Sequence, residues 1–217
     1  MAITNDKPLI FYTIREALKV SREESIFVSS DSSEILDYVS TFNIKTILRP
    51  DSLSTDESTS SDVIKHFIAE IADNSNDYKI LYLQPTSPLR TSKHIKDALN
   101  IFESEECKSV ISVSKSKQLP SKTFRLKDKY LVNLCNINTG SEIRQKAELT
   151  YYPNGAIYIF NKLDFINYGK IPDDKVSPYI MSDIDSIDID DNIDLEYVKL
   201  IMKNEWMNIG INERMNL

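Results

Sequence analysis

Glycine is scarce in this sequence: four of the 217 residues are glycine, whereas globular proteins average roughly 7%. The glycines at positions 140, 155, 169 and 210 lie too far apart to form a G-x-G-x-x-G dinucleotide fingerprint or a G-x-x-x-x-G-K-[ST] phosphate loop. The sequence therefore contains neither of these glycine-rich phosphate cradles.

Cysteine, histidine and long apolar runs are also scarce. Cys107 and Cys135 show no CxxC spacing, which indicates a reducing compartment rather than a disulfide scaffold. His66 and His94 each stand alone on a helical pattern, and we interpret them as surface or core residues rather than zinc ligands or a catalytic base. There is no signal-peptide pattern, and no apolar run approaches the roughly 18 residues of a membrane span. We expect a cytoplasmic, soluble protein with no membrane partner.

The net charge is −7, from 33 acidic and 26 basic side chains. This balance excludes a general nucleic-acid binder that relies on phosphate neutralisation. It leaves open a small anionic substrate, which needs only a few local cations or a metal ion.

Short apolar runs alternate with amphipathic helical patterns along most of the chain. The runs predict strands at 26–28, 46–48, 80–83, 110–113 and 156–160, and the patterns predict helices over 10–18, 35–42, 63–71, 95–102 and 191–204. This alternation predicts an α/β fold with a mostly parallel sheet covered on both faces. Ligands bind at the carboxyl ends of such strands, which directs attention to the loops that begin at Ser29, Arg49 and Gln84.

The alternation stops between residues 116 and 152. Polar residues and tyrosines mix there without a long period, and we interpret this stretch as an arm, with a β-hairpin, inserted in one domain that spans 1–217.

The loop at 84–90 (QPTSPLR) follows a predicted buried strand. Its two prolines restrict the backbone, so an amide, two hydroxyls and a guanidinium would form a defined array at the sheet edge. Such an array suits a hydroxyl-rich or anionic ligand. The alternative is a rigid turn in which Thr91 caps the next helix.

The segment 186–190 (SIDID) alternates apolar and acidic residues. In a strand, Ile187 and Ile189 would pack inward while Asp188 and Asp190 project together. Two adjacent carboxylates repel, so a divalent cation is a natural occupant. The calcium-loop pattern lacks its glycine and its last glutamate, which excludes an EF-hand. The alternative is a solvated acidic segment in which Asp190 or Asp191 caps the last helix.

Three cations, Arg49, Lys122 and Arg144, lie in or beside predicted loops. A lone basic residue is usually solvated, so only convergence with the two loops above would give these residues a function. The patterns alone predict a polar, metal-capable cleft and leave the reaction open.

Several segments, taken in chain order, resemble the CMP-sialic acid synthetases (acylneuraminate cytidylyltransferases). They are 7–10 (KPLI), 28–35 (VSSDSSEI), 48–50 (LRP), 60–64 (SSDVI), 83–90 (LQPTSPLR), 154–159 (NGAIYI) and 186–190 (SIDID). The resemblance implies a three-layer Rossmann-like nucleotidyltransferase fold. It also implies transfer of a cytidylyl group from CTP to the anomeric hydroxyl of a nonulosonic acid, with release of pyrophosphate and formation of a CMP-sugar.

The resemblance also implies roles for individual residues. Asp188 and Asp190 would hold Mg²⁺, with Mn²⁺ as an alternative, and would act in catalysis together with Gln84, which would bind the sugar. The substrate-binding set implied by the resemblance is Arg49, Ser60, Ser61, Gln84, Thr86, Lys122, Arg144, Gln145 and Asn154. The arm at 116–152 would form a homodimer and complete the partner's active site.

Family members begin with a strand and a basic, glycine-containing phosphate loop that has no counterpart in this sequence. We therefore expect an N-terminally truncated form with weak or no turnover. The alternatives are a non-catalytic sugar-binding or dimer-forming paralogue, a CMP-legionaminate or CMP-pseudaminate synthetase, and a nucleotidyltransferase for 3-deoxy sugar acids.

Overall fold

The computed structural model describes residues 3–4, 6–55, 57–71, 77–118, 120–134 and 149–215, with the side chains of the last helix described as far as Lys203. The helices are α1 (Leu9–Ala17), α2 (Ser33–Ser40), α3 (Ser60–Ile71), α4 (Ser92–Ser104), α5 (Lys162–Tyr168) and α6 (Asn192–Met215), with 3₁₀ turns η1 (Glu23–Ser25), η2 (Asp51–Leu53) and η3 (Pro120–Lys122). The strands are β1 (Ile3–Thr4), β2 (Lys7–Pro8), β3 (Phe27–Ser30), β4 (Lys45–Leu48), β5 (Lys79–Tyr82), β6 (Ser109–Lys115), β7 (Phe124–Lys127), β8 (Tyr130–Asn133), β9 (Tyr151–Asn161) and β10 (Val176–Ile180). In this described part of the chain, no helix is both long and apolar enough to cross a membrane.

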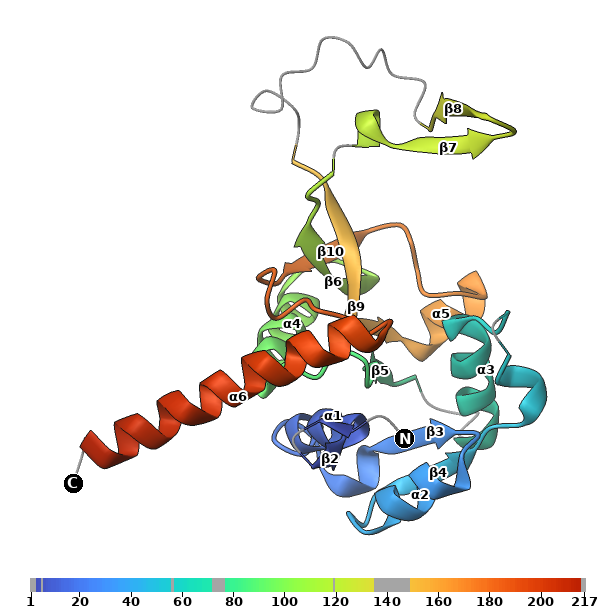
Figure 1. Ribbon diagram of the computed structural model, residues 1–217. Coiled ribbons are helices and arrows are strands. Elements are labelled where there is room, and N and C mark those ends of the chain that lie inside the picture. Colours follow the sequence, from blue (N-terminus) through green and yellow to red (C-terminus); the bar gives the residue numbers. More distant parts are fainter. Residues whose placement is uncertain are drawn as a thin grey trace.

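The main sheet has four strands in the order β10-β6-β9-β5 (Figure 1). β10 pairs with β6 in parallel, whereas β9 is antiparallel to both β6 and β5. β5, β6 and β10 therefore run in one direction and β9 runs in the other. The predicted mostly parallel sheet is confirmed, with β9 as the exception.

Helices cover both faces of this sheet because the side chains of β9 alternate. Ile157 and Ile159 pack on the face that carries Ala98 of α4, whereas Phe160 packs on the face that carries Ile64 of α3. The result is the three-layer α/β architecture that the alternation of apolar patterns predicted.

Two predicted helix caps are present. Thr91 Oγ1 accepts a 3.4 Å hydrogen bond from the His94 amide, and His94 Nδ1 accepts one of 3.2 Å from the Thr91 amide, so α4 begins with a capping box. At α6, Asp191 Oδ1 accepts hydrogen bonds from the amides of Ile193 (2.7 Å) and Asp194 (3.0 Å). Of the two capping residues considered for the last helix, Asp191 is the one that acts.

β3 and β4 form a separate parallel pair. An apolar cleft of about 830 Å³, the β3–β5 cleft, is lined by residues of β3 and β5.

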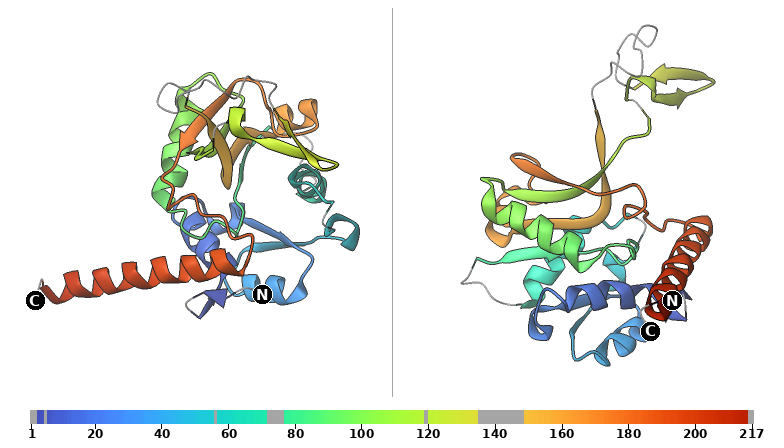
Figure 2. Two further views of the ribbon diagram at one scale, coloured as in Figure 1. Left: turned by 45° about the horizontal axis from the view of Figure 1, so that its top comes forward. Right: turned by 90° about the vertical axis from the view of Figure 1, so that its left-hand side faces the viewer.

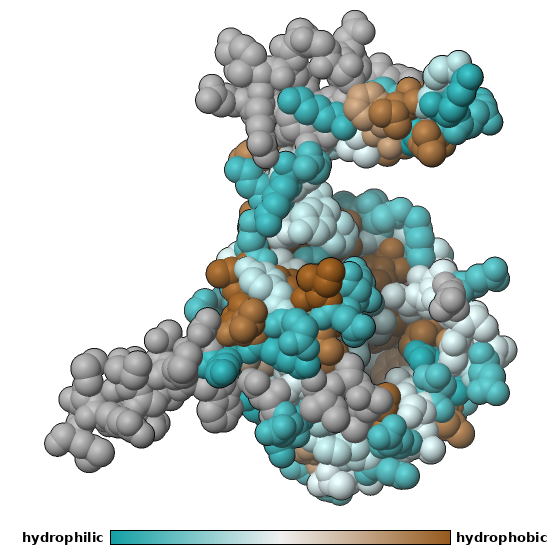
Figure 3. All heavy atoms as spheres, viewed as in Figure 1, coloured by the Kyte–Doolittle hydropathy of each residue, from teal (hydrophilic) through white to brown (hydrophobic). Residues whose placement is uncertain are grey.

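The β7–β8 hairpin projects from the body of the molecule on extensions of β6 and β9 (Figures 1 and 2). The pair lies within the arm predicted at 116–152. Leu126 and Leu131, which face each other across the hairpin, are 72% and 68% exposed. Apolar side chains accordingly show on the surface of the projecting hairpin (Figure 3).

Candidate active site

Two segments distant in sequence meet at the carboxyl end of β5. The loop after β5 receives a 2.9 Å hydrogen bond at the Thr86 carbonyl from the Ile189 amide. The segment 186–190 is irregular rather than the predicted strand, because its backbone bonds to this loop instead of to a sheet. Its alternation is retained: Ile187 and Ile189 pack against the apolar cluster that contains Tyr12.

Gln84 and Asp188 converge on Gly155 of β9. A Cβ atom added to Gly155 would lie 2.6 Å from Gln84 Oε1 and 3.1 Å from Asp188 Oδ2. Gly155 also has φ +77°, a conformation that side-chain-bearing residues rarely adopt. One of the few glycines thus stands where the amide and the carboxylate of the candidate site meet.

One oxygen of the Asp188 carboxylate accepts no hydrogen bond from the described residues. Its Oδ1 atom is buried and has no hydrogen-bond partner among the described residues. Burial is the main cause that raises the pKa of this carboxyl, the Thr86 hydroxyl opposes the shift, and the nearby Asp190 charge adds to it. A half-buried carboxylate beside a second, exposed one is the arrangement that a divalent cation would stabilise.

No group of three or more histidine, cysteine, aspartate or glutamate side chains in the described residues is arranged to hold a metal ion. A cation at Asp188 and Asp190 would therefore need other oxygen ligands, which Gln84, water or a bound phosphate can supply. The donor set fits a hard cation that keeps several non-protein ligands.

Arg90 is not part of the ligand-facing array that its place in the loop predicted. Its side chain is 2% exposed, and Nη1 donates to the carbonyls of Gln84 (3.0 Å) and Ala156 (2.7 Å), while Nη2 donates to Thr13 Oγ1 (2.7 Å). Burial lowers the pKa of Arg90 to about 10, so the guanidinium stays charged at neutral pH. Ser87, also predicted in the array, is fully buried. The loop thus uses its guanidinium internally, to join β5 to β9.

Asn154 is 3% exposed, and both ends of its amide bind protein groups. Its Oδ1 accepts from Ser112 Oγ (2.6 Å) and from the Ala156 amide (3.2 Å), and Nδ2 donates to Ser186 Oγ (2.8 Å). Asn154 therefore joins β6, β9 and the 186–190 segment beneath Gly155. This contrasts with the substrate contact that we predicted for it, because no polar atom of the side chain is free to receive a ligand.

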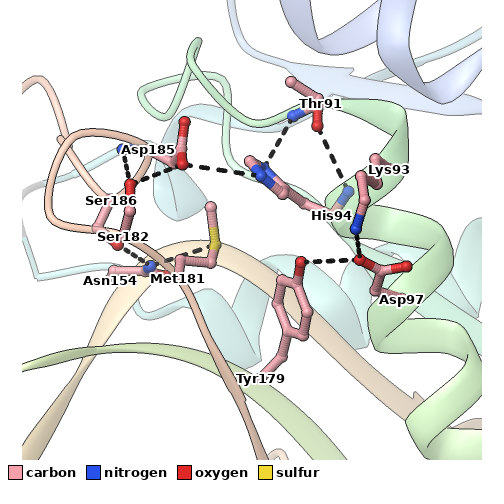
Figure 4. Close-up of polar contacts among 10 residues, drawn as sticks. All are labelled: Thr91, Lys93, His94, Asp97, Asn154, Tyr179, Met181, Ser182, Asp185 and Ser186. Carbon is pink, nitrogen blue, oxygen red and sulfur yellow. Dashed lines mark hydrogen bonds and ion pairs between the residues drawn. The ribbon is translucent and has the colours of Figure 1, made fainter.

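A second set of contacts ties the loop at 182–185, which leads into the 186–190 segment, to α4 (Figure 4). Asp185 accepts a 2.6 Å hydrogen bond from Ser182 Oγ and lies 3.8 Å from Nε2 of His94. Burial is the main cause that lowers the pKa of His94. Thr91, His94 and Asp185 thus hold the loop before Asp188 in place, and the interpretation of His94 as a structural residue agrees with these contacts.

The remaining predicted residues lie in three places. Arg49 lines the β3–β5 cleft, where Nη2 donates to Asp31 Oδ1 at 2.9 Å and Nε donates to Ser54 Oγ at 3.1 Å. Ser60 and Ser61 are half-buried in the first turn of α3. Lys122 is exposed on the arm. The predictions for Arg144 and Gln145 concern residues outside the described part of the chain.

Sequence reasoning missed the roles of Gly155 and Arg90. A signal existed for Gly155, since a lone glycine inside an apolar strand pattern often marks a close approach to another group. For Arg90 no local signal existed, because a loop arginine and a buried arginine look alike in sequence.

The sequence as a whole is similar to those of known proteins. A sequence profile described as cytidylyltransferase matches residues 2–204.

The chain belongs to the cytidylyltransferase family.

Individual relatives carry narrower names. This chain is 34% identical over 201 residues to an N-acylneuraminate cytidylyltransferase of Streptococcus agalactiae, and the match covers 91% of this chain and 48% of that protein. The corresponding Escherichia coli protein is 33% identical, covering 97% of this chain and 52% of that protein. A CMP-N,N'-diacetyllegionaminic acid synthase of Legionella pneumophila is 32% identical, covering 91% and 86%. The chain spans about half the length of the first two relatives.

Solved structures show the same fold. A CMP:2-keto-3-deoxy-manno-octonic acid synthetase complexed with CTP superposes with a TM-score of 0.65 at 15% identity, covering 94% of this chain and 91% of that one. A 4-diphosphocytidyl-2C-methyl-D-erythritol synthase from Anaerococcus prevotii gives 0.64 at 14% identity, covering 93% and 88%. At such identities the likeness concerns the fold of this cytidylyltransferase-family chain.

Proposed function

We propose that this protein transfers a cytidylyl group from CTP to a nonulosonic acid of the sialic type. The observation that carries the proposal is the convergence of Gln84 and Asp188 on Gly155. Gln84 supplies an amide suited to sugar hydroxyls, and Asp188 supplies a carboxylate whose Oδ1 atom is buried and has no hydrogen-bond partner among the described residues. Relatives named N-acylneuraminate cytidylyltransferase support the choice of reaction.

The reaction moves one phosphorus centre between two oxygens. The anomeric hydroxyl oxygen of the sugar forms a bond to the α-phosphorus of CTP, the bond from that phosphorus to the bridging oxygen breaks, and pyrophosphate leaves. The hydroxyl proton passes to solvent or to a nearby base. Gln84 orients the sugar through its hydroxyls, which lowers the entropic cost of bringing the two reactants together.

Mg²⁺, or Mn²⁺ in its place, fits the carboxylate pair. Asp188 and Asp190 would hold the ion, and the raised pKa of Asp188 fits such a role because a cation offsets the burial and repulsion that raise it. When bound, the ion neutralises charge on the phosphates and on the leaving group. Thr86 and the Asn154 network hold Asp188 in position for that ligand.

The substrate is proposed as a class. The relatives named for N-acylneuraminate and for N,N'-diacetyllegionaminic acid match this chain at 34% and 32% identity. Both acids share the carboxylate, the anomeric hydroxyl and the nine-carbon backbone, which are the groups that Gln84 and the cation site would meet.

Arg49, Ser60 and Ser61 form the proposed nucleotide side. Arg49 lies at the carboxyl end of β4 and lines the β3–β5 cleft together with Leu83 and Pro85, which flank Gln84. An anion at this end would compete with Asp31 for the guanidinium, because Arg49 now donates to that carboxylate. Lys122, Arg144 and Gln145 are proposed for the arm side of the site.

The arm is proposed to form a homodimer. Its exposed leucines, phenylalanine and tyrosines are more apolar surface than an isolated hairpin can bury, and such surface usually marks an interface. In a dimer these side chains would leave water.

The test is a direct assay of the full chain. CTP, Mg²⁺ and N-acetylneuraminate are incubated with it, and pyrophosphate and the CMP-sugar are measured, with legionaminate, pseudaminate and 3-deoxy-manno-octonate as alternative acceptors. The proposal requires at least weak product formation with one nonulosonic acid or more, and a large loss of that activity in Gln84→Ala. Gln118→Ala, an exposed glutamine on the arm, is the matched control.

Two outcomes would contradict the proposal. Turnover with 3-deoxy-manno-octonate alone would assign a different acceptor class. Calorimetry that shows sugar binding without CTP binding, and no pyrophosphate, would assign a non-catalytic sugar-binding protein.

A further inference from the structure

Strand β9 departs from regular pairing beside the candidate active site. Its register against β6 slips between two pairs, Ile111↔Tyr158 and Val113↔Pro153. One residue of β6, Ser112, therefore stands opposite four residues of β9, 154–157, which form the β9 bulge. Pairing of β9 with β5 also ends before the bulge. Gly155, the point on which the candidate site converges, lies inside this irregular stretch of backbone.

The Ser112 side chain makes the bonds that a regular strand ladder would make at this point. Its hydroxyl accepts a 2.7 Å hydrogen bond from the Ile157 amide and donates one of 2.6 Å to Asn154 Oδ1. These partners are the last and the first residue of the β9 bulge, so a single hydroxyl joins both of its ends to β6. Ser112 is fully buried, and water therefore offers no ready substitute for either bond.

The β9 bulge reaches both side chains of the candidate site. At its centre, a Cβ atom added to Gly155 would lie 2.6 Å from Gln84 Oε1 and 3.1 Å from Asp188 Oδ2. At its first residue, Asn154 Nδ2 donates a 2.8 Å hydrogen bond to Ser186 Oγ, two residues before Asp188. A change in the shape of the bulge would therefore displace the amide and the carboxylate together.

Other contacts of the β9 bulge do not take the place of Ser112. Arg90 Nη1 donates to the Ala156 carbonyl, and Asn154 Oδ1 accepts from the Ala156 amide. The first bond leads to the loop after β5 and the second stays within the bulge, so neither connects the bulge to β6. Both bonds of Ser112 start from β6, the strand against which the register slips.

We propose that Ser112 is a positioning residue for the reaction, whose hydroxyl sets the shape of the β9 bulge and thereby the places of Gln84 and Asp188. It acts through these two residues and not on the substrate, since its proton and one of its lone pairs are bound by protein groups. The effect on turnover rests on the proposed function. The effect on the geometry of the site does not, and it is measurable without CTP or sugar.

Amide nuclear magnetic resonance spectra of the full chain test the effect on geometry. The side-chain amide resonances of Gln84, assigned by their loss in Gln84→Ala, report the surroundings of that side chain without any ligand. Ser112→Ala removes the hydroxyl and should shift these resonances. It should also speed hydrogen exchange at the Ile157 amide by about tenfold or more, because that amide loses its acceptor.

Ser109→Ala is the matched control. Ser109 is a fully buried serine at the start of β6, and its hydroxyl donates a 2.8 Å hydrogen bond to the Pro172 carbonyl, outside the candidate site. Urea unfolding should show a comparable loss of stability in the two variants, since each loses a buried hydroxyl. The Gln84 resonances and the relative exchange rate of Ile157 should stay as in the wild type in Ser109→Ala alone.

Two further measurements follow the site itself. Thermal unfolding over a MgCl₂ titration should show binding about tenfold or more weaker in Ser112→Ala, as is usual when a group that orients a metal ligand is removed. In the pyrophosphate assay, the KM for the sugar should rise by a similar factor because Gln84 is displaced. The KM for CTP should stay close to that of the wild type, since the proposed nucleotide contacts lie at Arg49, away from the bulge.

The proposal is overturned if the Gln84 resonances and the Ile157 exchange in Ser112→Ala match those in Ser109→Ala. It is equally overturned if the resonances shift while Mg²⁺ binding and the KM for the sugar stay unchanged. Should Ser112→Ala not fold, Ser112→Cys decides, with Ser109→Cys as its control: the thiol is a weaker donor and acceptor, and unshifted Gln84 resonances would refute the role. A wild type that makes no CMP-sugar, combined with shifted resonances in Ser112→Ala, would support the positioning by Ser112 and contradict the proposed function instead.

Discussion

Arg90 Nη1 donates a 2.7 Å hydrogen bond to the carbonyl of Ala156, a residue of β9 that lies 66 positions later in the chain. The same nitrogen donates to the carbonyl of Gln84. One buried guanidinium therefore fixes the distance between the loop that carries Gln84 and the strand that carries Gly155. The geometry of the candidate site depends on this link, although the Arg90 side chain is itself buried.

Arg90→Met should destabilise the protein strongly. It would leave the carbonyls of Ala156 and Gln84 and the hydroxyl of Thr13 without their donor, and breaking such a network costs about 3 kcal/mol or more. Urea unfolding of the wild type and the variant measures the difference. Lys93→Met, which removes an exposed ion pair on α4, should cost about 0.5 kcal/mol or less. Equal effects of the two substitutions would contradict the role of Arg90.

Gly155→Ala should disrupt the site beyond its effect on the backbone. The added Cβ would lie 2.6 Å from Gln84 Oε1, so Gln84 or Asp188 must move. The strain of positive φ alone costs about 1–2 kcal/mol. Gly169→Ala is the matched control, since Gly169 has φ +68° with no atom within 4 Å of an added Cβ.

Both glycine variants should lose similar backbone stability in thermal unfolding. Only Gly155→Ala should lose ligand binding or product formation, by about tenfold or more, which corresponds to roughly 1.4 kcal/mol. An intact site in Gly155→Ala would show that Gln84 and Asp188 do not act at that point.

Asp188→Asn should separate metal binding from stability. Because burial and Asp190 raise the pKa of Asp188, the ionised carboxyl destabilises the metal-free fold at neutral pH. The metal-free variant should therefore unfold at a higher temperature than the wild type. It should also lose the stabilisation by Mg²⁺, which for the wild type is about 2.7 kcal/mol at a hundredfold excess over Kd.

The raised pKa of Asp188 also predicts how the stability of the protein and its Mg²⁺ binding depend on pH. As the pH falls through the raised pKa toward the ordinary value of 3.8, the folded protein takes up a proton before the unfolded chain does. The penalty at Asp188 is relieved in that window, and Mg²⁺ binding is lost in it because proton and metal compete. Thermal unfolding with and without Mg²⁺ across this range measures both effects. Asp183→Asn, an exposed carboxylate of the same loop, should retain the wild-type Mg²⁺ response.

Replacing Leu126 and Leu131 by lysine should dissociate the proposed dimer. The two side chains face each other on the hairpin and are exposed, and burying each is worth about 1.5–3 kcal/mol. Their loss should raise the dimer dissociation constant about 100-fold or more, as measured by sedimentation velocity. Lys127→Gln, on the same strand, should not change it. A wild-type chain that sediments as a monomer would contradict the proposal before any substitution is made.

Local patterns in the sequence determined the elements and the segments that meet at the site. Apolar runs and helical periodicity placed the strands and helices, because burial demands a period of two or of 3.6 residues. Thr91 was correctly predicted as the N-cap of α4. Gln84 follows a predicted strand, and Asp188 lies between two isoleucines. Both features are local in the chain, so the sequence alone could single out these two residues as candidate site residues.

Only the tertiary structure decided how these segments are combined. The antiparallel direction of β9, the burial of Arg90, the internal pairing of Asn154 and the meeting of Gln84 with Asp188 over Gly155 all depend on strand order. So does the cleft between β3 and β5. Strand order arises from contacts between residues far apart in the chain, and no local period records which edges will be neighbours. The sequence by itself thus determined which groups were available, and the packing of the sheet decided which of them face a ligand.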